Sequence, residues 1–334
     1  MMKLKQLLPF CVSLLVIISC SNNRFEIDTD KVDLNLKIER FDRDLMSLDT
    51  TNIEDEVENL SNKYGDFFPR FATGVIMLGS PDSTNFNTHI KAFISDSMVQ
   101  EIYKETQLVF DDVSDIQQET NEAFKYIKYY FPDKKLPRIA MHISGFNQSI
   151  VVTDDFISIS IDNYLGADYA LYKNIVYDYQ LQNMTRSKVA SDIVLGYLMS
   201  EFPFENNSQL LAGILSRGKI LYLQSICMTQ RSEADLMGYT TEQLEWCVQN
   251  EKNMWTYIVE NKHLYNTSQI VCSKYLNPAP FTTFFSEESP GQAGIWLGLQ
   301  IIKSYMQKNT DITLPQLVEE TDYQKILEQS NYKP

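Results

Sequence analysis

LLAGILSRGKILYLQSICM, residues 210–228, has apolar residues on nearly every side of the helix that it would form. A helix that is apolar all round is buried, so we expect this one to be the central helix of the protein. Helical spacing also returns before and after it. The helices predicted in this half of the chain span 187–201, 208–227, 241–261, 292–307 and 315–329.

The pattern changes in the middle of the chain, where short β-branched runs alternate with turn residues. These runs, at 138–144, 149–152 and 157–161, predict a small sheet with a hairpin through Gly145-Phe146-Asn147. Before them we expect a strand at 34–38, helices at 53–64, 98–110 and 116–131, and an aromatic break at 67–71. Together the elements predict one mostly helical α+β domain with a small central sheet over residues 34–334.

Three glycines, Gly291, Gly294 and Gly298, are spaced along the helix expected at 292–307. A phosphate-binding loop would place its glycines between a strand and a helix, and that context is missing here. We therefore expect these glycines to let another helix approach closely.

The first twenty residues have the pattern of an exported bacterial lipoprotein. Two lysines precede an apolar stretch at 7–18, which is shorter than the roughly 20 residues that span a bilayer. Ile17-Ile18-Ser19-Cys20 then resembles a lipobox, whose cysteine takes a diacylglycerol and becomes the new N-terminus. We predict a signal peptide at 1–19, a lipid anchor at Cys20 and an acidic tether at 20–33. Several acyl chains on one residue anchor a protein stably to a membrane.

Charge and the residue after Cys20 bear on partners and location. The formal net charge is -15, and removal of residues 1–19, which contain two lysines and no acids, makes it -17. Such a surface repels nucleic acid, because DNA binding depends on basic contacts to phosphate. Ser21, rather than aspartate, follows the cysteine, which by bacterial sorting habits favours the outer membrane. We expect the protein to face the periplasm.

Histidine and serine chemistry is sparse. His89, His142 and His263 lie far apart, and none has a second histidine at the spacing of a zinc peptidase helix. His142 alternates with apolar neighbours, which favours a structural imidazole. The nearest approach to a serine-hydrolase elbow, at 213–218, has the wrong spacing and a helical context.

Two further groups of side chains have residue types that can take part in chemistry. The cysteines after the anchor are odd in number and have apolar neighbours, so we expect buried free thiols. They are Cys227, Cys247 and Cys272. Four aspartates gather around the exit of the expected sheet and could bind a cation or act as acid and base. They are Asp154, Asp155, Asp162 and Asp168. A solvated acidic loop is the alternative that we favour in so acidic a chain.

Short motifs follow in order along the mature chain. They are Arg40-Phe41-Asp42, Tyr164-Leu165-Gly166-Ala167-Asp168-Tyr169, Arg217-Gly218-Lys219, Gly238-Tyr239-Thr240, Trp246-Cys247, Ser289-Pro290, Trp296-Leu297-Gly298 and Tyr332-Lys333-Pro334. With the lipobox, they resemble the gliding motility lipoprotein GldB family of the Bacteroidetes. The resemblance implies a role in the gliding and type IX secretion machinery through contacts with envelope proteins.

The family is similar in layout to zinc peptidases whose helix after the sheet carries His-Glu-x-x-His. Here the corresponding helix, 191–196, has no histidine, and Arg217 stands where the third ligand would be. The resemblance therefore implies a zincin-like scaffold that has lost its metal ligands, with no metal and no cofactor. We expect Asp192 and Arg217 to face each other in this vestigial site as an ion pair.

Three functions are compatible with these observations. The one that we favour is a non-catalytic envelope protein, attached to the membrane through lipid on Cys20 and acting through protein contacts. The second is a degenerate metallopeptidase-like fold that binds a peptide or glycan in a groove, which a cleft beside residues 187–219 would favour. The third is a metal-independent hydrolase that uses Asp residues; a glycosidase would need two carboxyls roughly 5 to 9.5 Å apart.

Overall fold

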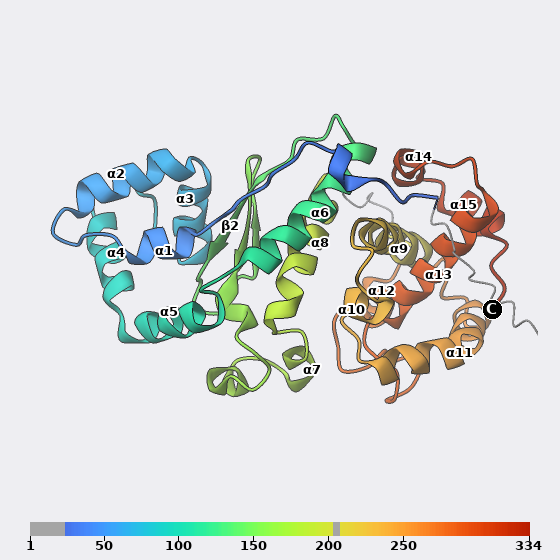
Figure 1. The fold of residues 1–334 in the computed structure, drawn as a ribbon. Helices are drawn as coiled ribbons and strands as arrows, with labels where there is room; N and C mark the ends of the chain where they lie inside the picture. Colours follow the sequence, from blue (N-terminus) through green and yellow to red (C-terminus); the bar gives the residue numbers. More distant parts are fainter. Residues whose placement is uncertain (1–23, 203–207) are drawn as a thin grey trace, which may run out of the picture.

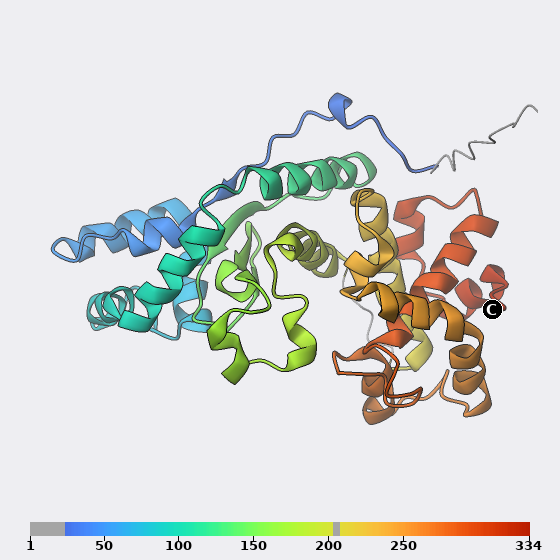
Figure 2. The ribbon, with the colours of Figure 1, turned by 60° about the horizontal axis from the view of Figure 1, so that its bottom comes forward.

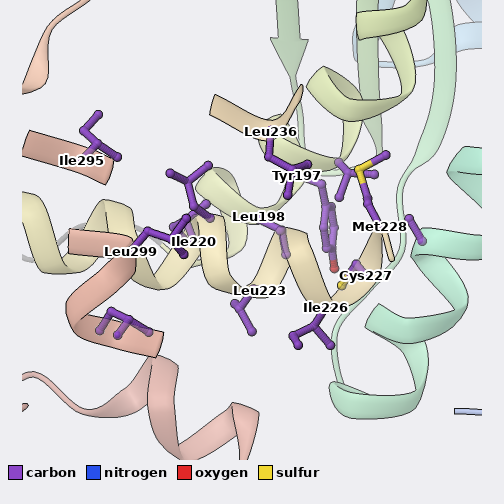
Figure 3. Packing of buried hydrophobic residues seen from close by; sticks show 14 of the residues in the cluster. Tyr197, Leu198, Ile220, Leu223, Ile226, Cys227, Met228, Leu236, Ile295 and Leu299 are labelled. Atoms are coloured by element: carbon purple, nitrogen blue, oxygen red, sulfur yellow. The ribbon is translucent and has the colours of Figure 1, made fainter. Parts of the chain in front are cut away.

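In the computed structural model, which describes residues 24–202 and 208–334, helix α9 (Leu210–Cys227) lies at the centre of the C-terminal half. Most of its 18 residues are buried, which confirms its prediction as the central helix. It packs against α13 (Ala293–Lys308), α8 (Val189–Glu201) and α6 (Ser114–Tyr130) (Figure 1). Figure 3 shows side chains from this core, among them Leu198, Leu223 and Leu299.

Five further helices described by the structure complete the C-terminal half. They are α10 (Glu233–Met237), α11 (Thr241–Glu260), α12 (Gln269–Leu276), α14 (Leu314–Glu319) and α15 (Tyr323–Ser330). The helices predicted at 187–201, 241–261 and 292–307 are confirmed within a few residues. The single helix predicted at 315–329 is wrong, because Asp322 caps a new helix by accepting the backbone N–H of Lys325.

The sheet has four strands in the order β1-β2-β4-β3. They are β1 (Ile38–Glu39), β2 (Arg138–His142), β3 (Ile150–Val152) and β4 (Phe156–Ser160). β2 runs parallel to β1 and β4, whereas β3 is antiparallel to β4. The small sheet is confirmed, but the hairpin predicted through Gly145 is wrong, because β3 pairs with β4 and not with β2. The backbone N–H groups of Ser144 and Phe146 instead donate to the Asp162 carboxylate.

Both faces of the sheet are covered by helices (Figure 1). The face toward α6 and α8 carries Ile139, Met141, Ile157 and Ile159. The other face carries Ala140 and Phe156 and packs against the N-terminal helices. Alternate residues of a strand point to opposite faces, so strands covered on both sides are apolar at most positions.

A second core lies on the N-terminal side of the sheet. Its elements are α1 (Phe41–Met46), α2 (Ile53–Tyr64), α3 (Phe67–Arg70), the π-helical turn η2 (Phe71–Val75) and α4 (Phe86–Ser95). The helix predicted at 53–64 is confirmed. The aromatic break predicted at 67–71 is wrong, because these residues are helical and pack their rings around Phe41.

The connection from this core to the sheet has two further helices. The helices predicted at 98–110 and 116–131 are confirmed as α5 (Ser97–Val109) and α6. The strand predicted at 34–38 is reduced to the two residues of β1. The Leu36 backbone N–H donates to the Asn121 side chain of α6 at 2.8 Å, in place of a strand partner.

The prediction that three glycines let another helix approach closely is confirmed for Gly294, which meets α12, and for Gly298, which meets α9, whereas Gly291 meets the loop at Ala279. A Cβ at Gly291, Gly294 or Gly298 would collide with another segment of the chain. Within residues 24–202 and 208–334, every helix is too short or too polar to span a bilayer.

Part of the predicted tether lies against the folded body. Phe25 is buried and packs edge-on against Tyr130 and Tyr222. Arg24 donates to the backbone carbonyl of Ile312 at 3.2 Å. Figure 2 shows this blue segment running alongside α6. Cys20 lies outside the described residues.

Candidate functional site

The predicted site residue Asp192 lies in the first turn of α8 and borders a cavity of about 370 Å³, which we call the Asp192 cavity. One wall comes from residues 146–192, which include α7 (Asp178–Leu181), and the other from residues 237–292. Gln180 of α7 and Met237 of α10 belong to opposite walls, and both helices are labelled in Figure 1. The cavity therefore lies beside residues 187–219, where a binding groove would be expected.

The Asp192 carboxylate has a hydroxyl as its partner. The Tyr164 hydroxyl donates to Oδ2 of Asp192 at 2.8 Å. Burial raises the pKa of Asp192, and the charges of Lys188 and Arg231 act in the opposite direction. Burial and the Asp192 carboxylate together hold the pKa of Tyr164 well above its usual value. Tyr164 therefore keeps its proton at neutral pH and donates this hydrogen bond to Asp192.

A second carboxyl, Asp162, shapes the wall. It is completely buried and accepts the backbone N–H of Phe146 at 2.8 Å and the hydroxyl of Ser160. The Tyr172 hydroxyl donates to its main-chain carbonyl at 2.5 Å. Burial raises the pKa of Asp162, and these hydrogen bonds to the carboxylate lower it. Asp162 thus holds the loop that brings Phe146 to the cavity.

Three of the amide side chains that line the cavity donate from their nitrogens to backbone carbonyls of the protein. Gln182 and Asn183 both donate to the Gly238 carbonyl, at 2.8 and 3.1 Å, and Gln292 donates to the Leu276 carbonyl at 3.1 Å. A backbone carbonyl can only accept, so the atom facing it in each case is the NH₂ group. The three amide oxygens have no hydrogen-bond partner in the part of the chain that the structure describes. They remain available to a ligand.

The predicted partner of Asp192, Arg217, borders a second cavity of about 290 Å³. Its Nη1 donates to the Leu276 carbonyl at 2.6 Å, and burial lowers the pKa of the guanidinium. The two cavities adjoin, because they share part of their lining. The shared residues are Met237, Pro278 and Gln292. The two predicted site residues thus border neighbouring spaces, and the ion pair between them stays a prediction.

The four aspartates around the sheet do not gather at one place. Asp154 and Asp155 precede β4, whereas Asp162 follows it. The five residues of β4, at about 3.3 Å each, separate these ends by roughly 17 Å. This exceeds the roughly 5 to 9.5 Å between paired glycosidase carboxyls. Asp155 and Asp162 therefore do not form the carboxyl pair that a glycosidase would need.

The histidines and cysteines are spread through the fold. His142 is completely buried with its Nδ1 2.7 Å from the Ser158 hydroxyl, as expected for a structural imidazole. All three described cysteines are free, as expected; Cys227 and Cys247 are also buried as expected, whereas Cys272 is partly exposed. Among residues 24–202 and 208–334, no three His, Cys, Asp or Glu side chains are placed to hold a metal ion.

The amide side chains of the cavity were missed by sequence reasoning. Gln182 and Asn183 follow α7 and meet Gly238, more than fifty residues later, only through the tertiary fold. The sequence did single out their acceptor, because Gly238 belongs to the family motif Gly238-Tyr239-Thr240. This glycine ends α10 with a left-handed backbone, φ 69°, and its carbonyl is the acceptor for both amides.

Comparison with known proteins identifies a family. A family model described as gliding motility protein GldB matches residues 22–334. No curated protein and no solved structure matches the chain. The zincin-like scaffold expected from the resemblance therefore has no support from a known structure.

Proposed function

This chain belongs to the GldB family of gliding motility proteins, and we propose that it serves gliding motility by binding other proteins, without catalysis. The family is a gliding motility component and not a known enzyme family, and its lipoproteins belong to the cell envelope. In this proposal the protein supports the gliding or type IX secretion machinery through contacts with envelope proteins.

Lipid on Cys20 would attach the protein to the outer membrane, facing the periplasm. The lipobox and Ser21 support this location. Only three residues separate Cys20 from Arg24, which contacts Ile312 on the folded body. Four residue steps span at most about 14 Å when fully extended. The side of the body around Arg24 would therefore lie close to the membrane.

The observation that carries the proposal is the Asp192 cavity. Two parts of the chain form its walls, and three amide oxygens there have no hydrogen-bond donor among the described residues. Tyr179 lines the cavity, and Tyr177, which is 73% exposed, stacks on it with ring centroids 5.9 Å apart. Exposed aromatic residues beside polar groups are typical of protein interfaces, where they supply much of the binding energy.

The residues that the resemblance alone sets against the zinc site of peptidases also lack the groups that would bind zinc. Zinc in such peptidases is held by imidazole and carboxylate ligands. Residues 191–196 contain no histidine, and Arg217 carries a positive charge where the third ligand would be. A guanidinium repels a metal cation, so the chemistry of the related peptidases has no counterpart in these residues.

Affinity purification from detergent-solubilised envelopes, with the acylated cysteine intact, tests the proposal. A photo-cross-linking residue replaces Gln182 in the cavity wall, and the control replaces Ile270, which is 73% exposed on α12. We expect one or a few envelope proteins at stable stoichiometry, cross-linked from position 182 and not from position 270. Recovery of the protein alone, or a partner that cross-links equally from both positions, would contradict the proposal.

A second candidate function is a degenerate peptidase-like groove that binds a free peptide or a glycan. The same cavity favours it, because amide groups and aromatic rings suit both peptide groups and sugar hydroxyls. A peptide or sugar recovered from the purified protein, in place of an envelope protein, would shift the conclusion to this function.

A further inference from the structure

The charged side chains around Asp192 do not balance. Lys188 and Arg231 interact electrostatically with Asp192, and Glu119 and Asp235 interact with these two bases. With all five side chains ionised, three acids face two bases and one negative charge is left over, while burial raises the pKa of Asp192 and so opposes its ionised form.

Both bases of this group are engaged elsewhere. Arg231 makes a two-pronged ion pair with Glu119, at 2.5 and 2.6 Å, and the Lys188 ammonium donates to the main-chain carbonyl of Asp235. Among the described residues, Asp192 has only the Tyr164 hydroxyl as a hydrogen-bond partner. Among these residues, the Asp192 carboxyl therefore borders the cavity without a direct hydrogen bond to a base, and the charges of Lys188 and Arg231 act on it only from a distance. A desolvated carboxylate is costly unless it is paired, so a cation placed here would be stabilised.

The rest of the wall also suits a cation. The amide oxygens of Gln182, Asn183 and Gln292 are acceptors, and the rings of Phe146 and Tyr179 line the same space. The face of an aromatic ring attracts cations through its quadrupole. Lysine and arginine side chains carry only donors, three and five respectively, and so match a wall of acceptors.

We propose that the Asp192 cavity receives a lysine or arginine side chain of the protein partner, with its cationic head on the Asp192 carboxylate. This inference rests on the proposed function, because it names the part of the partner that binds. Arginine fits better, since its planar group reaches a carboxylate with two parallel N–H donors.

Size and overall charge agree with this occupant. The cavity, at about 370 Å³, is near the lower end of the roughly 300–1,000 Å³ that ligand pockets span. It has room for one long side chain and its adjoining backbone. The net charge of -15 attracts a basic segment over a longer range. A neutral glycan would meet the same amides but would bring no positive charge to the Asp192 carboxyl.

Peptide binding to the full mature protein in detergent tests the inference. The probe is N-acetyl-Gly-Arg-Gly-amide, and its control carries citrulline, which replaces the guanidinium by a neutral urea of similar shape. We expect the arginine peptide to bind at least about tenfold more tightly, as close charge pairs at interfaces do. Asp192→Asn should abolish this preference, and its amide oxygen still accepts the Tyr164 hydroxyl. Asp178→Asn, which removes an equal charge from an exposed site outside the cavity, should retain it.

Equal binding of the two peptides, or an unchanged preference in Asp192→Asn, would overturn the inference, as would binding of chitotetraose alone. If Asp192→Asn does not fold, the comparison of the two peptides on the unaltered protein still tests the inference. Cross-linking separates this inference from the proposed function. A partner that cross-links from position 182 equally well in Asp192→Asn would overturn only the inference, whereas a lack of any cross-linked partner contradicts the proposed function itself.

Discussion

Gly218 on α9 and Gly298 on α13 lie against each other where the two helices cross. A Cβ on Gly218 would lie 2.6 Å from the Gly298 carbonyl oxygen, and a Cβ on Gly298 would collide with the carbonyl of Ile214. The helices therefore touch through their backbones, which only glycine permits. Each of the two glycines belongs to a family motif, and the crossing gives both motifs a structural reason.

We expect Gly298→Ala to lower the free energy of unfolding by about 1–3 kcal/mol or more, the range for overpacked cores. The added methyl group meets backbone rather than a flexible side chain, so the helices themselves must move apart. Denaturant or thermal unfolding of the mature protein measures the effect. Gly74→Ala is the control, because a Cβ there meets nothing within 4 Å. Equal stability of the two variants would contradict this prediction.

The buried ion pair of the first family motif should also be essential for stability. Asp42 is completely buried and accepts two hydrogen bonds from Arg40, at 2.9 and 2.7 Å, and one from Gln107 at 3.0 Å. Asp42→Ala leaves the Arg40 charge without its carboxylate, so we expect a loss of about 3–5 kcal/mol in urea unfolding. Asp133→Ala, at an exposed carboxyl, should change stability by less than about 0.5 kcal/mol. A similar small loss for Asp42→Ala would refute the structural role of this motif.

Stability should fall in acid partly through His142. Burial lowers the pKa of His142 to about 3, from 6.5 in an accessible histidine. Below pH 6.5 the histidine of the unfolded chain therefore binds a proton, whereas in the folded protein it binds that proton only near pH 3. When the pH falls from 7 to 5, the unfolding free energy of the native protein should therefore decrease by about 2 kcal/mol more than that of His142→Gln.

Unfolding free energies of the native protein and His142→Gln at the two pH values measure this difference. Other titrating groups, including the buried Asp162 and Asp192, are present in both proteins and cancel. If the difference in unfolding free energy between the two proteins were the same at pH 7 and at pH 5, His142 would take up its proton in the folded protein as readily as in the unfolded chain. That result would contradict the prediction.

Thiol labelling should distinguish the three free cysteines. Burial raises the pKa of Cys227 and of Cys247 to about 12, so neither forms a thiolate near neutral pH. We expect maleimide to modify only Cys272, which is partly exposed, in the native protein, and all three after denaturation. Intact mass measures the number of adducts, and Cys272→Ser should prevent the native reaction. A native adduct on either buried thiol would contradict this assignment.

Local patterns in the sequence predicted most helices, and contacts between distant segments explain the errors. The helices at 53–64 and 241–261 follow from apolar spacing within each segment. The partner of β3 does not, because strand pairing joins separate segments, and Asp162 binds the loop that was expected to be the hairpin. The helix at 67–71 was missed, because its rings are stabilised by packing on Phe41.

By itself the sequence determined the family, the mostly helical α+β class and the central position of α9, since these follow from the order of motifs and from local apolar patterns. Through the resemblance to zinc peptidases, the sequence also indicated Asp192 as a site residue. Only the tertiary structure decided that Asp192 borders a cavity with amide oxygens on its wall. The walls come from residues 146–192 and 237–292, and polar side chains so far apart in the chain converge only when the helices that carry them pack together.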